Sequence, residues 1–563
     1  MSTLLTVVLF LPLAGALVAA FLPRGEGSQH KTWALLVSIA TFLASLGLWF
    51  GFDPSRSAPE FQFETSVPWI ASLGIRYHVG LDGVALLLVM LTTALAPVVI
   101  LAAWKEIDER VKEFFIALLF LETAMIGTFA ALDLVLFYVF YEAILVPMYL
   151  LIGIWGSENR VYATVKFFVY TFAASVLMLV AILYVYVNAG RTFDYVAVRS
   201  GLQVSQGTGA LLFGAFALAF AVKVPMFPVH TWLPDAHTEA PTAGSVILAG
   251  VLLKMGTFGF LRYAMPLFPE AALRYRGWIA AVAVLGIAYG ALMCFVQKDM
   301  KRLVAYSSVS HMGFVVLGLM AVTAEGISGS VYQMLNHGVS TGGLFLLVGM
   351  MKERRHTRLI SEFGGIAKQV PWLATLFLLV TFSSVGLPGT NGFIGEFLIL
   401  SGTWLSRLPN AGWYAALAAT GVVLGAVYML TLVQKVFFGP ITNPENRHIP
   451  DLSVREAFVM LPIVVAIVAM GLVPQPLLAT GRTSVDRLVA RMQAAEQRMR
   501  QADPSLPQMV GTEPAALAFA RANHDPKAHA FAFFFIAVAA AEAAGGTAIV
   551  VGIFRHPRSV TVD

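Results

Sequence analysis

The sequence predicts an all-α integral membrane protein with about fourteen transmembrane helices, some of them broken, and one extra helix at the C-terminal end. Two observations carry this prediction. Apolar runs of about 20 residues, the length a helix needs to cross a bilayer, recur along the chain. Charged residues make up only 12%, against roughly 25% in soluble domains, and 58% of the 563 residues are hydrophobic. The lipid bilayer is therefore the first expected partner.

The expected spans follow one another with short connections. They cover residues 3–22, 31–50, 81–104, 113–131, 132–155, 166–188, 209–228, 241–263, 277–296, 303–323, 329–350, 372–400, 410–438 and 455–478. A hydrophilic stretch, 482–529, comes next, and one more apolar run, 530–553, follows it. The first run lacks a basic n-region and is long enough to span, so it is expected as a retained helix and not as a cleaved signal.

Lysine and arginine alternate between the connections. They gather in odd-numbered ones, such as 105–112, 298–302 and 352–368, and are absent from even ones near 132 and 324–328. The positive-inside rule then places the N-terminus outside, and an odd fifteenth span places the C-terminus in the cytoplasm. The exceptions to this pattern are Arg262, Arg274, Arg276 and the basic 482–529 stretch.

Two predicted helices are interrupted by proline and glycine, at 220–228 (FAVKVPMFP) and 384–396 (SVGLPGTNGFIGE). Each carries one ionisable residue, Lys223 or Glu396, and each lies about two-thirds of the way through its half of the chain. Paired broken helices in corresponding positions are typical of transporters built from repeats, usually inverted ones. The alternative is that both are ordinary proline kinks.

Ionisable residues inside predicted spans are the candidate functional residues. A lysine in hydrocarbon costs about 2.5–3.5 kcal/mol on insertion scales, so such residues are kept where they face a protein-enclosed, hydrated path. The main set is Glu142, Lys223, Lys254 and Glu396, and Glu122 lies in the span before Glu142. Together they predict proton or cation movement through a relay. The alternative for Glu142 is a structural Glu–Lys pair that only fixes helix packing.

Four histidines extend this set. His311 is expected near the start of its span, and His337 lies in a small-residue-rich helix, QMLNHGVSTGG. Histidine can pass a proton in either direction near neutral pH, but a lone histidine in a helix is more often a packing residue. His230 and His237 flank a short polar elbow, where hydrogen-bond braces of the broken backbone are favoured over relay members.

Other classes of function find no support in the residues. The only cysteine, Cys294, lies in an apolar run, so neither a disulfide within the chain nor a cysteine metal site is expected. No His, Asp and Glu spacing resembles a metal site, and no glycine-rich dinucleotide or phosphate loop is present. No basic stripe with interleaved aromatic residues indicates nucleic acid.

Four motifs carry a resemblance to a known family. YHVGLDGVALLLVMLTT (77–93), LFYVFYEAILVPMYLLIGIWG (136–156), KVPMFPVHTWLPDAH (223–237) and GLPGTNGFIGEFLIL (386–400) resemble the subunit M (chain 4) family of bacterial respiratory complex I. That family belongs to the antiporter-like proteins, which also include the L and N subunits and Mrp-type cation/proton antiporters. The resemblance covers about residues 1–480.

The resemblance implies fourteen core helices, with inverted five-helix repeats at 113–263 and 277–438 after N-terminal helices at 1–112 and before helix 14 at 455–478. It implies that Glu142 pairs with Lys223 of the broken seventh helix. Lys254 then corresponds to the connecting lysine of the eighth helix, and Glu396 to the terminal residue of the broken twelfth. Glutamate at this last position favours the M type over L, N and Mrp-type relatives, which usually carry lysine.

The tail departs from the M pattern. FAFFFIAVAAAEAAGGTAIVVGIFRHPRSVTVD (531–563), within the segment 530–563, is similar to the third helix and terminus of subunit K (chain 4L). Glu542 matches the intramembrane glutamate of that subunit. The alternative is a plain anchoring helix with a buried glutamate.

The resemblance implies a proton-translocating membrane-arm subunit of an NADH:quinone oxidoreductase in the bacterial inner membrane. NADH, FMN, iron–sulfur clusters and quinone are expected on partner subunits, with none in this chain, and the membrane neighbours are expected to be L-, N- and K-type subunits. An Mrp-type Na⁺/H⁺ antiporter subunit, a subunit of a membrane-bound hydrogenase and a non-conducting scaffold are the alternatives. Nucleic acid is not an expected partner.

Overall fold

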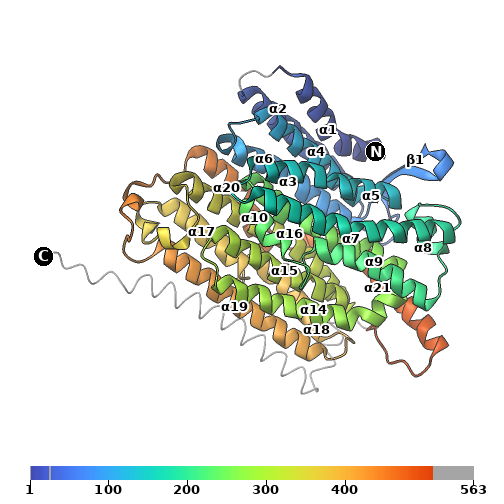
Figure 1. Cartoon of the computed structure of the whole chain (residues 1–563). Helices are drawn as coiled ribbons and strands as arrows, with labels where there is room; N and C mark the ends of the chain where they lie inside the picture. Colours follow the sequence, from blue (N-terminus) through green and yellow to red (C-terminus); the bar gives the residue numbers. More distant parts are fainter. Residues whose placement is uncertain (1, 24–26, 512–563) are drawn as a thin grey trace.

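The computed structural model describes residues 2–23 and 27–511, and Figure 1 shows a bundle of long helices packed side by side. Thirteen helical segments in the described part of the chain are long and apolar enough to cross a membrane. The predicted all-α, multi-pass architecture is therefore confirmed. One β-hairpin is added to it.

Several helices in the first half of the chain begin directly after an aspartate that caps their N-terminus. The side chains of Asp82, Asp133 and Asp194 accept hydrogen bonds from the backbone N–H groups at the starts of α3, α5 and α8, which would otherwise lack partners. These helices and their neighbours are α1 (Ser2–Phe21), α2 (Ser28–Gly51), α3 (Gly83–Glu106), α4 (Val111–Ala130), α5 (Leu134–Ala143), α6 (Leu145–Trp155), α7 (Arg160–Asn188) and α8 (Tyr195–Gly201).

The first predicted break is confirmed. Helix α9 (Gln206–Lys223) ends at its lysine, because Pro225 and Pro228 lack the N–H that a continuing helix requires. Most of the polar elbow after the break forms a second short helix, α10 (Trp232–Glu239).

The next span, 242–267, is helical throughout but not regular. It consists of α11 (Thr242–Ile247), the π-helical turn η2 (Leu248–Leu252), α12 (Leu253–Gly259), a second π-helical turn η3 (Phe260–Ala264) and α13 (Met265–Leu267). The 18-residue apolar window of this span is completely buried by the surrounding helices. Wide turns of this kind occur frequently at functional sites.

The second half of the chain also contains a broken helix. The predicted interruption at 384–396 is confirmed, because α17 (Pro371–Ser384) and α18 (Asn391–Trp404) are separated by Gly386, Pro388 and Gly389. The two glycines have φ of 80° and 93°, a conformation that other residues rarely adopt. The other helices of this half are α14 (Pro269–Phe295), α15 (Met300–Ala321), α16 (Ala324–Arg355), α19 (Ala411–Phe437) and α20 (Val454–Leu472), and short 3₁₀ turns η4 (Ile360–Glu362), η5 (Ile366–Lys368) and η6 (Pro444–His448) lie between them.

Residues 482–502, expected in a hydrophilic linker, belong to helix α21 (Gln475–Ala502). Its apolar residues Val485, Leu488, Met492, Ala495 and Met499 recur every three or four positions and are buried. This spacing gives one apolar face, which packs on α3, α14 and α16. The remainder of the predicted linker and the C-terminal segment with Glu542 lie outside the described residues.

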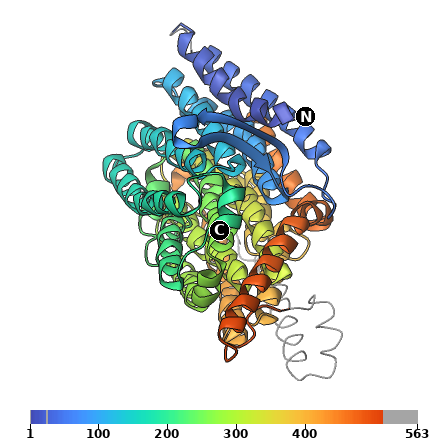
Figure 2. The same cartoon turned by 90° about the vertical axis from the view of Figure 1, so that its right-hand side faces the viewer.

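The hairpin was not predicted. Strands β1 (Gln62–Ile70) and β2 (Ile75–Leu81) pair antiparallel, with the 3₁₀ turn η1 (Ala71–Leu73) between them and Gly74 in the left-handed region at φ 69°. Figure 2 shows the hairpin crossing one face of the molecule, with α21 on the same face. Arg56, just before the hairpin, lies 2.8 Å from Asp486 of α21.

Candidate functional site

The predicted site residues on α9, α12, α15, α16 and α18 are buried within the helix bundle. Lys223, Lys254, His311, His337 and Glu396 each expose 8% of their surface or less. They come from five different helices, α9, α12, α15, α16 and α18. Since buried polar groups without partners are costly, the contacts that each one makes define the site.

Lys254 and His337 form the most direct contact. Lys254 Nζ lies 2.6 Å from His337 Nδ1, and it also donates to the backbone carbonyl of Ala249 in the π-helical turn η2. The geometry fits two protonation states. Either the Lys254 ammonium donates to a neutral His337, or a neutral Lys254 accepts the Nδ1–H proton of His337. One proton can therefore be held on either side of this contact.

A second contact joins His311 to Glu396. His311 Nδ1 lies 3.1 Å from Glu396 Oε1, and Gln333 Nε2 donates to the same oxygen at 3.0 Å. Asn336 Nδ2 in turn donates to Gln333 Oε1 at 3.0 Å, which fixes the orientation of the amide. Contrary to expectation, His311 lies in the middle of its helix, because α15 begins at Met300.

The two histidines face a shared polar cavity. Their ring centres are 5.9 Å apart, and the Nε2 atoms of both are buried without a hydrogen-bond partner. The cavity is lined by His311, Gln333, Asn336, His337, Ser340, Thr341, Ser383, Ser384 and Gly392. Such a polar lining suits bridging water, which needs several hydrogen-bonding partners. Lys254, His337, His311 and Glu396 thus form one polar row that leads from the 242–267 span through α16 and α15 to α18.

Lys223 and Glu142 lie in the first half. Lys223 Nζ is 4.9 Å from the ring centre of Tyr141, and neither this nitrogen nor Glu142 Oε1 has a hydrogen-bond partner. In the described part of the chain no ion pair joins Glu142 to Lys223. The pair that the family resemblance implies is thus open in this structure. The tyrosine ring contacts the ammonium in place of the carboxylate.

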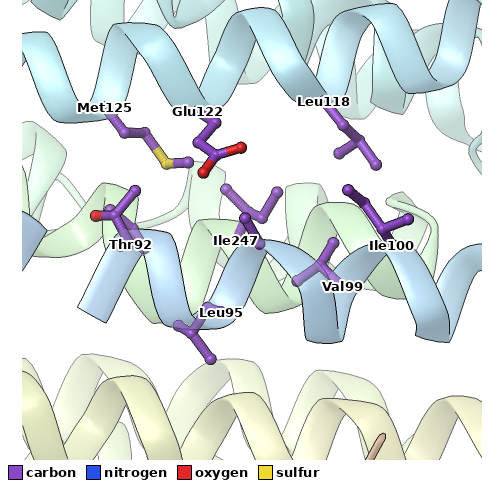
Figure 3. Close-up of a pocket in the computed structure, with 10 residues that line it drawn as sticks. Thr92, Leu95, Val99, Ile100, Leu118, Glu122, Met125 and Ile247 are labelled. Atoms are coloured by element: carbon purple, nitrogen blue, oxygen red, sulfur yellow. The ribbon is translucent and has the colours of Figure 1, made fainter. Parts of the chain in front are cut away.

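Glu122 occupies a separate cavity. Figure 3 shows its carboxyl group extending from α4 toward α3, beside Met125 and Thr92. Both carboxyl oxygens are buried and have no hydrogen-bond partner. Most of the residues that line this cavity are apolar: Leu95, Ala96, Val99, Ile100, Leu118, Ile247 and Val251. No contact links Glu122 to the polar row in the described residues.

The elbow histidines contact aromatic rings. His237 stacks on Phe345 with ring centres 4.5 Å apart, and His230 lies 4.9 Å from Tyr289. Neither ring nitrogen of His237 has a hydrogen-bond partner, and His230 Nδ1 also lacks one. The brace expected for His237 is therefore an aromatic stack and not a hydrogen bond.

Several polar residues of the site were not predicted. Gln333, Asn336, Ser340 and Thr341 surround His337 on α16. The five positions 333, 336, 337, 340 and 341 recur at helical spacing and so lie on one face. This polar face within an apolar span was the signal that could have identified them.

Known proteins resemble this chain over most of its length. The family model NADH:quinone oxidoreductase/Mrp antiporter, TM matches residues 131–425, and the model NADH-ubiquinone/plastoquinone oxidoreductase chain 4L matches residues 509–563. The chain is 46% identical to NADH-quinone oxidoreductase subunit M of Rhodobacter capsulatus, over 84% of this chain and 94% of that protein. It is 42% identical to NADH-ubiquinone oxidoreductase chain 4 of Arabidopsis thaliana, over 85% and 95%.

Solved structures give the same result. A chain of respiratory complex I from Thermus thermophilus with bound NADH superposes with a TM-score of 0.79 at 33% identity, covering 87% of this chain and 99% of that one. A chain of an archaeal membrane-bound sulfane sulfur reductase shares the fold, with a TM-score of 0.73 at 24% identity. The chain therefore belongs to the NADH:quinone oxidoreductase/Mrp antiporter family and groups with its subunit M members, with a chain 4L-type segment at its C-terminal end.

Proposed function

We propose that this chain is a proton-translocating membrane-arm subunit of a complex I-type NADH:quinone oxidoreductase, and that it moves protons through the buried lysine, histidine and glutamate side chains. The observation that carries the proposal is the polar row Lys254–His337–His311–Glu396. Its ends are direct contacts of 2.6 and 3.1 Å, and a polar cavity lies between them. The relatives are named as subunits of NADH-quinone and NADH-ubiquinone oxidoreductases, which supports the proposal that electron transfer takes place in partner subunits of such a complex.

The ring nitrogens suggest the order of transfer. A proton on Lys254 passes to His337 Nδ1, and His337 Nε2 releases a proton into the cavity. His311 Nε2 takes it up through water, and His311 Nδ1 passes a proton to Glu396. Each imidazole thereby receives a proton on one nitrogen and releases one from the other, which is the ordinary chemistry of a histidine shuttle.

Lys223 and Glu142 act as the switch that loads this row. A carboxylate within about 4–6 Å of an ammonium favours its charged form, so closing or opening the pair changes the proton affinity of Lys223. In this structure Lys223 lies over Tyr141 and forms no direct ion pair with Glu142, so the carboxylate stabilises the ammonium less than it would in a closed pair. Energy from electron transfer in partner subunits is proposed to drive the change, and NADH, FMN, iron–sulfur clusters and quinone would bind there. The paired breaks at Lys223 and Glu396 are part of the same proposal, in which 113–263 and 277–438 are inverted repeats.

The proposed orientation places the N-terminus and the hairpin outside. It is supported by the contacts among the odd-numbered connections, which carry most of the basic residues. Lys31 Nζ donates to the Trp104 carbonyl at 2.7 Å, and Arg358 Nε lies 3.1 Å from Asp299 Oδ2. Connections that contact one another lie on one side of the membrane, here the cytoplasmic side.

The experiment is proton pumping by inverted membrane vesicles, with NADH oxidation followed in parallel, for Lys223→Ala and Glu142→Ala. Exposed Lys105→Ala and Glu158→Ala are matched controls. We expect assembly to persist while pumping and coupled electron transfer collapse in the first two variants only. Pumping at the wild-type level in both would show that the two residues are structural. Ion transport without NADH-dependent activity would favour an Mrp-type antiporter.

A further inference from the structure

A second polar cavity lies on the hairpin face, away from the row of lysine, histidine and glutamate. It is formed by the connection before the hairpin, α8, the end of the 242–267 span and α21. Its charged lining consists of Glu60, Asp82, Arg199, Arg262, Arg487 and Arg491. Four arginines thus face two carboxylates, which leaves an excess of two positive charges.

Two of the arginines are neutralised by the carboxylates. Arg199 binds Glu60 through both oxygens, at 2.6 and 2.7 Å. Arg262 Nη2 lies 2.5 Å from Asp82 Oδ1. The Arg199 contact lowers the pKa of the Glu60 carboxyl despite the burial that opposes this, so Glu60 is ionised at neutral pH. Glu60 also acts on Arg491 at longer range, but neither carboxylate pairs directly with Arg487 or Arg491 in the described part of the chain.

Arg487 and Arg491 have no carboxylate partner in the described part of the chain. Arg487 donates only to the backbone carbonyl of Ala58, at 2.7 Å. Burial, and then the nearby Arg199, lower the pKa of Arg491. Arg199 and Arg491 are thus near enough for their like charges to repel in a partly buried place, and Glu60 offsets this only in part. A further anion in the cavity would reduce the repulsion.

Arg262 has a buried hydrogen-bond donor that lacks an acceptor. Its side chain is only 3% exposed, and its Nη1 atom is buried with no hydrogen-bond partner. The guanidinium is held between the rings of Phe61 and Phe258, each 5.0 Å away, so its orientation is fixed. A buried donor of this kind costs free energy unless an acceptor is supplied.

We propose that this cavity binds a phosphate-bearing anion, with Arg262, Arg487 and Arg491 as the donors. Guanidinium groups match phosphate oxygens through pairs of parallel N–H donors. The cavity lies beside Asp82, which caps the start of the α3 span, and beside the end of the 242–267 span. It is therefore at the level of the membrane interface, within reach of both a phospholipid headgroup and a free phosphate ion.

The test is an electron-density map of the intact complex in two preparations. One is in nanodiscs of phosphatidylglycerol and phosphatidylcholine in phosphate-free buffer, and the other is in detergent with inorganic phosphate. Density with acyl tails in the first preparation identifies a lipid headgroup. Compact density in the second alone identifies free phosphate. An empty cavity in both, or one filled by protein, overturns the proposal.

Arg491→Gln tests the same site in solution, and exposed Arg482→Gln on the same helix is its matched control. The complex is titrated with inorganic phosphate or phosphatidylglycerol, and binding is measured from the shift in unfolding temperature. We expect about tenfold weaker binding for Arg491→Gln, because it loses one charge-assisted hydrogen bond. Arg482→Gln should bind like wild type. Equal binding by both variants and wild type overturns the proposal, and none of these results depends on whether the relay conducts protons.

Discussion

Lys254 Nζ and His337 Nδ1 lie 2.6 Å apart in the buried centre of the protein, although 83 residues separate them in the sequence. Neither is held by an acidic partner in this contact. The lysine is instead anchored by the Ala249 carbonyl of the π-helical turn beside it. The proton in this contact can therefore move between two bases.

Lys254→Met keeps the length of the side chain and removes its proton. We expect proton pumping to fall by about tenfold or more, because positioned acid–base groups typically contribute at least that factor. The measurement is the pumping rate of inverted vesicles, normalised to assembled complex. Lys105→Met, on the surface, should pump normally. A Lys254→Met complex that pumps at the wild-type rate would contradict the relay.

Glu396→Gln removes the ability to take up a proton but keeps the shape of the residue. In the wild-type protein Gln333 Nε2 donates to Glu396 Oε1 at 3.0 Å, and the side-chain oxygen of the substituted glutamine can still accept this hydrogen bond. We expect pumping to fall about tenfold or more while the unfolding temperature stays within a few degrees of wild type. If stability falls and pumping per assembled complex does not, Glu396 is a packing residue.

Glu122→Met tests the cavity of Figure 3. Both oxygens of Glu122 are buried without hydrogen-bond partners among mainly apolar residues, so an apolar side chain of similar volume should fit. We expect the free energy of unfolding to rise by about 1 kcal/mol, the lower end of the cost of a buried unsatisfied group. Because no contact links Glu122 to the polar row in the described residues, pumping should be retained. Loss of pumping with unchanged stability would instead place Glu122 on the proton path.

His78 gives a prediction for pH dependence outside the membrane spans. Its Nδ1 lies 2.5 Å from Asp194 and its Nε2 2.8 Å from Glu64, and these bonds raise the pKa of His78 against the opposing effect of burial. Burial by itself would raise the pKa of Asp194, but the bond with His78 outweighs this effect, so the pKa of Asp194 is lowered. The stabilisation from His78 is thus full below about 6.5, its unfolded pKa, and is lost as pH rises through the raised folded pKa.

The stabilisation from Asp194 depends on pH in the opposite direction. It is present above about 3.9, the unfolded pKa, and is lost as pH falls through the lowered folded pKa. The measurement is thermal unfolding of the complex between pH 5 and pH 9 for wild type and His78→Gln. The stability difference between the two should be largest at acidic to neutral pH and should shrink toward alkaline pH. A difference that does not change with pH would show that folding leaves the pKa of His78 unchanged.

Part of this site could be predicted from the sequence. The charged residues in apolar runs identified Glu142, Lys223, Lys254 and Glu396, because hydrocarbon makes a charge costly wherever the helix lies. Proline and glycine predicted both breaks, since their effect on the backbone is local. The hairpin and the amphipathic helix α21 were missed, although α21 carries its signal in the spacing of its buried residues.

The sequence by itself determined the membrane class, the helix breaks and the identity of the ionisable residues, because these depend on solvation and backbone geometry within one segment. The tertiary structure alone decided which residues meet. It joined His311 to Glu396 and Lys254 to His337, placed Lys223 over Tyr141, and left Glu122 in its own cavity. Such contacts join helices that are distant in the sequence, and only the packing of the whole bundle brings their side chains within hydrogen-bonding distance.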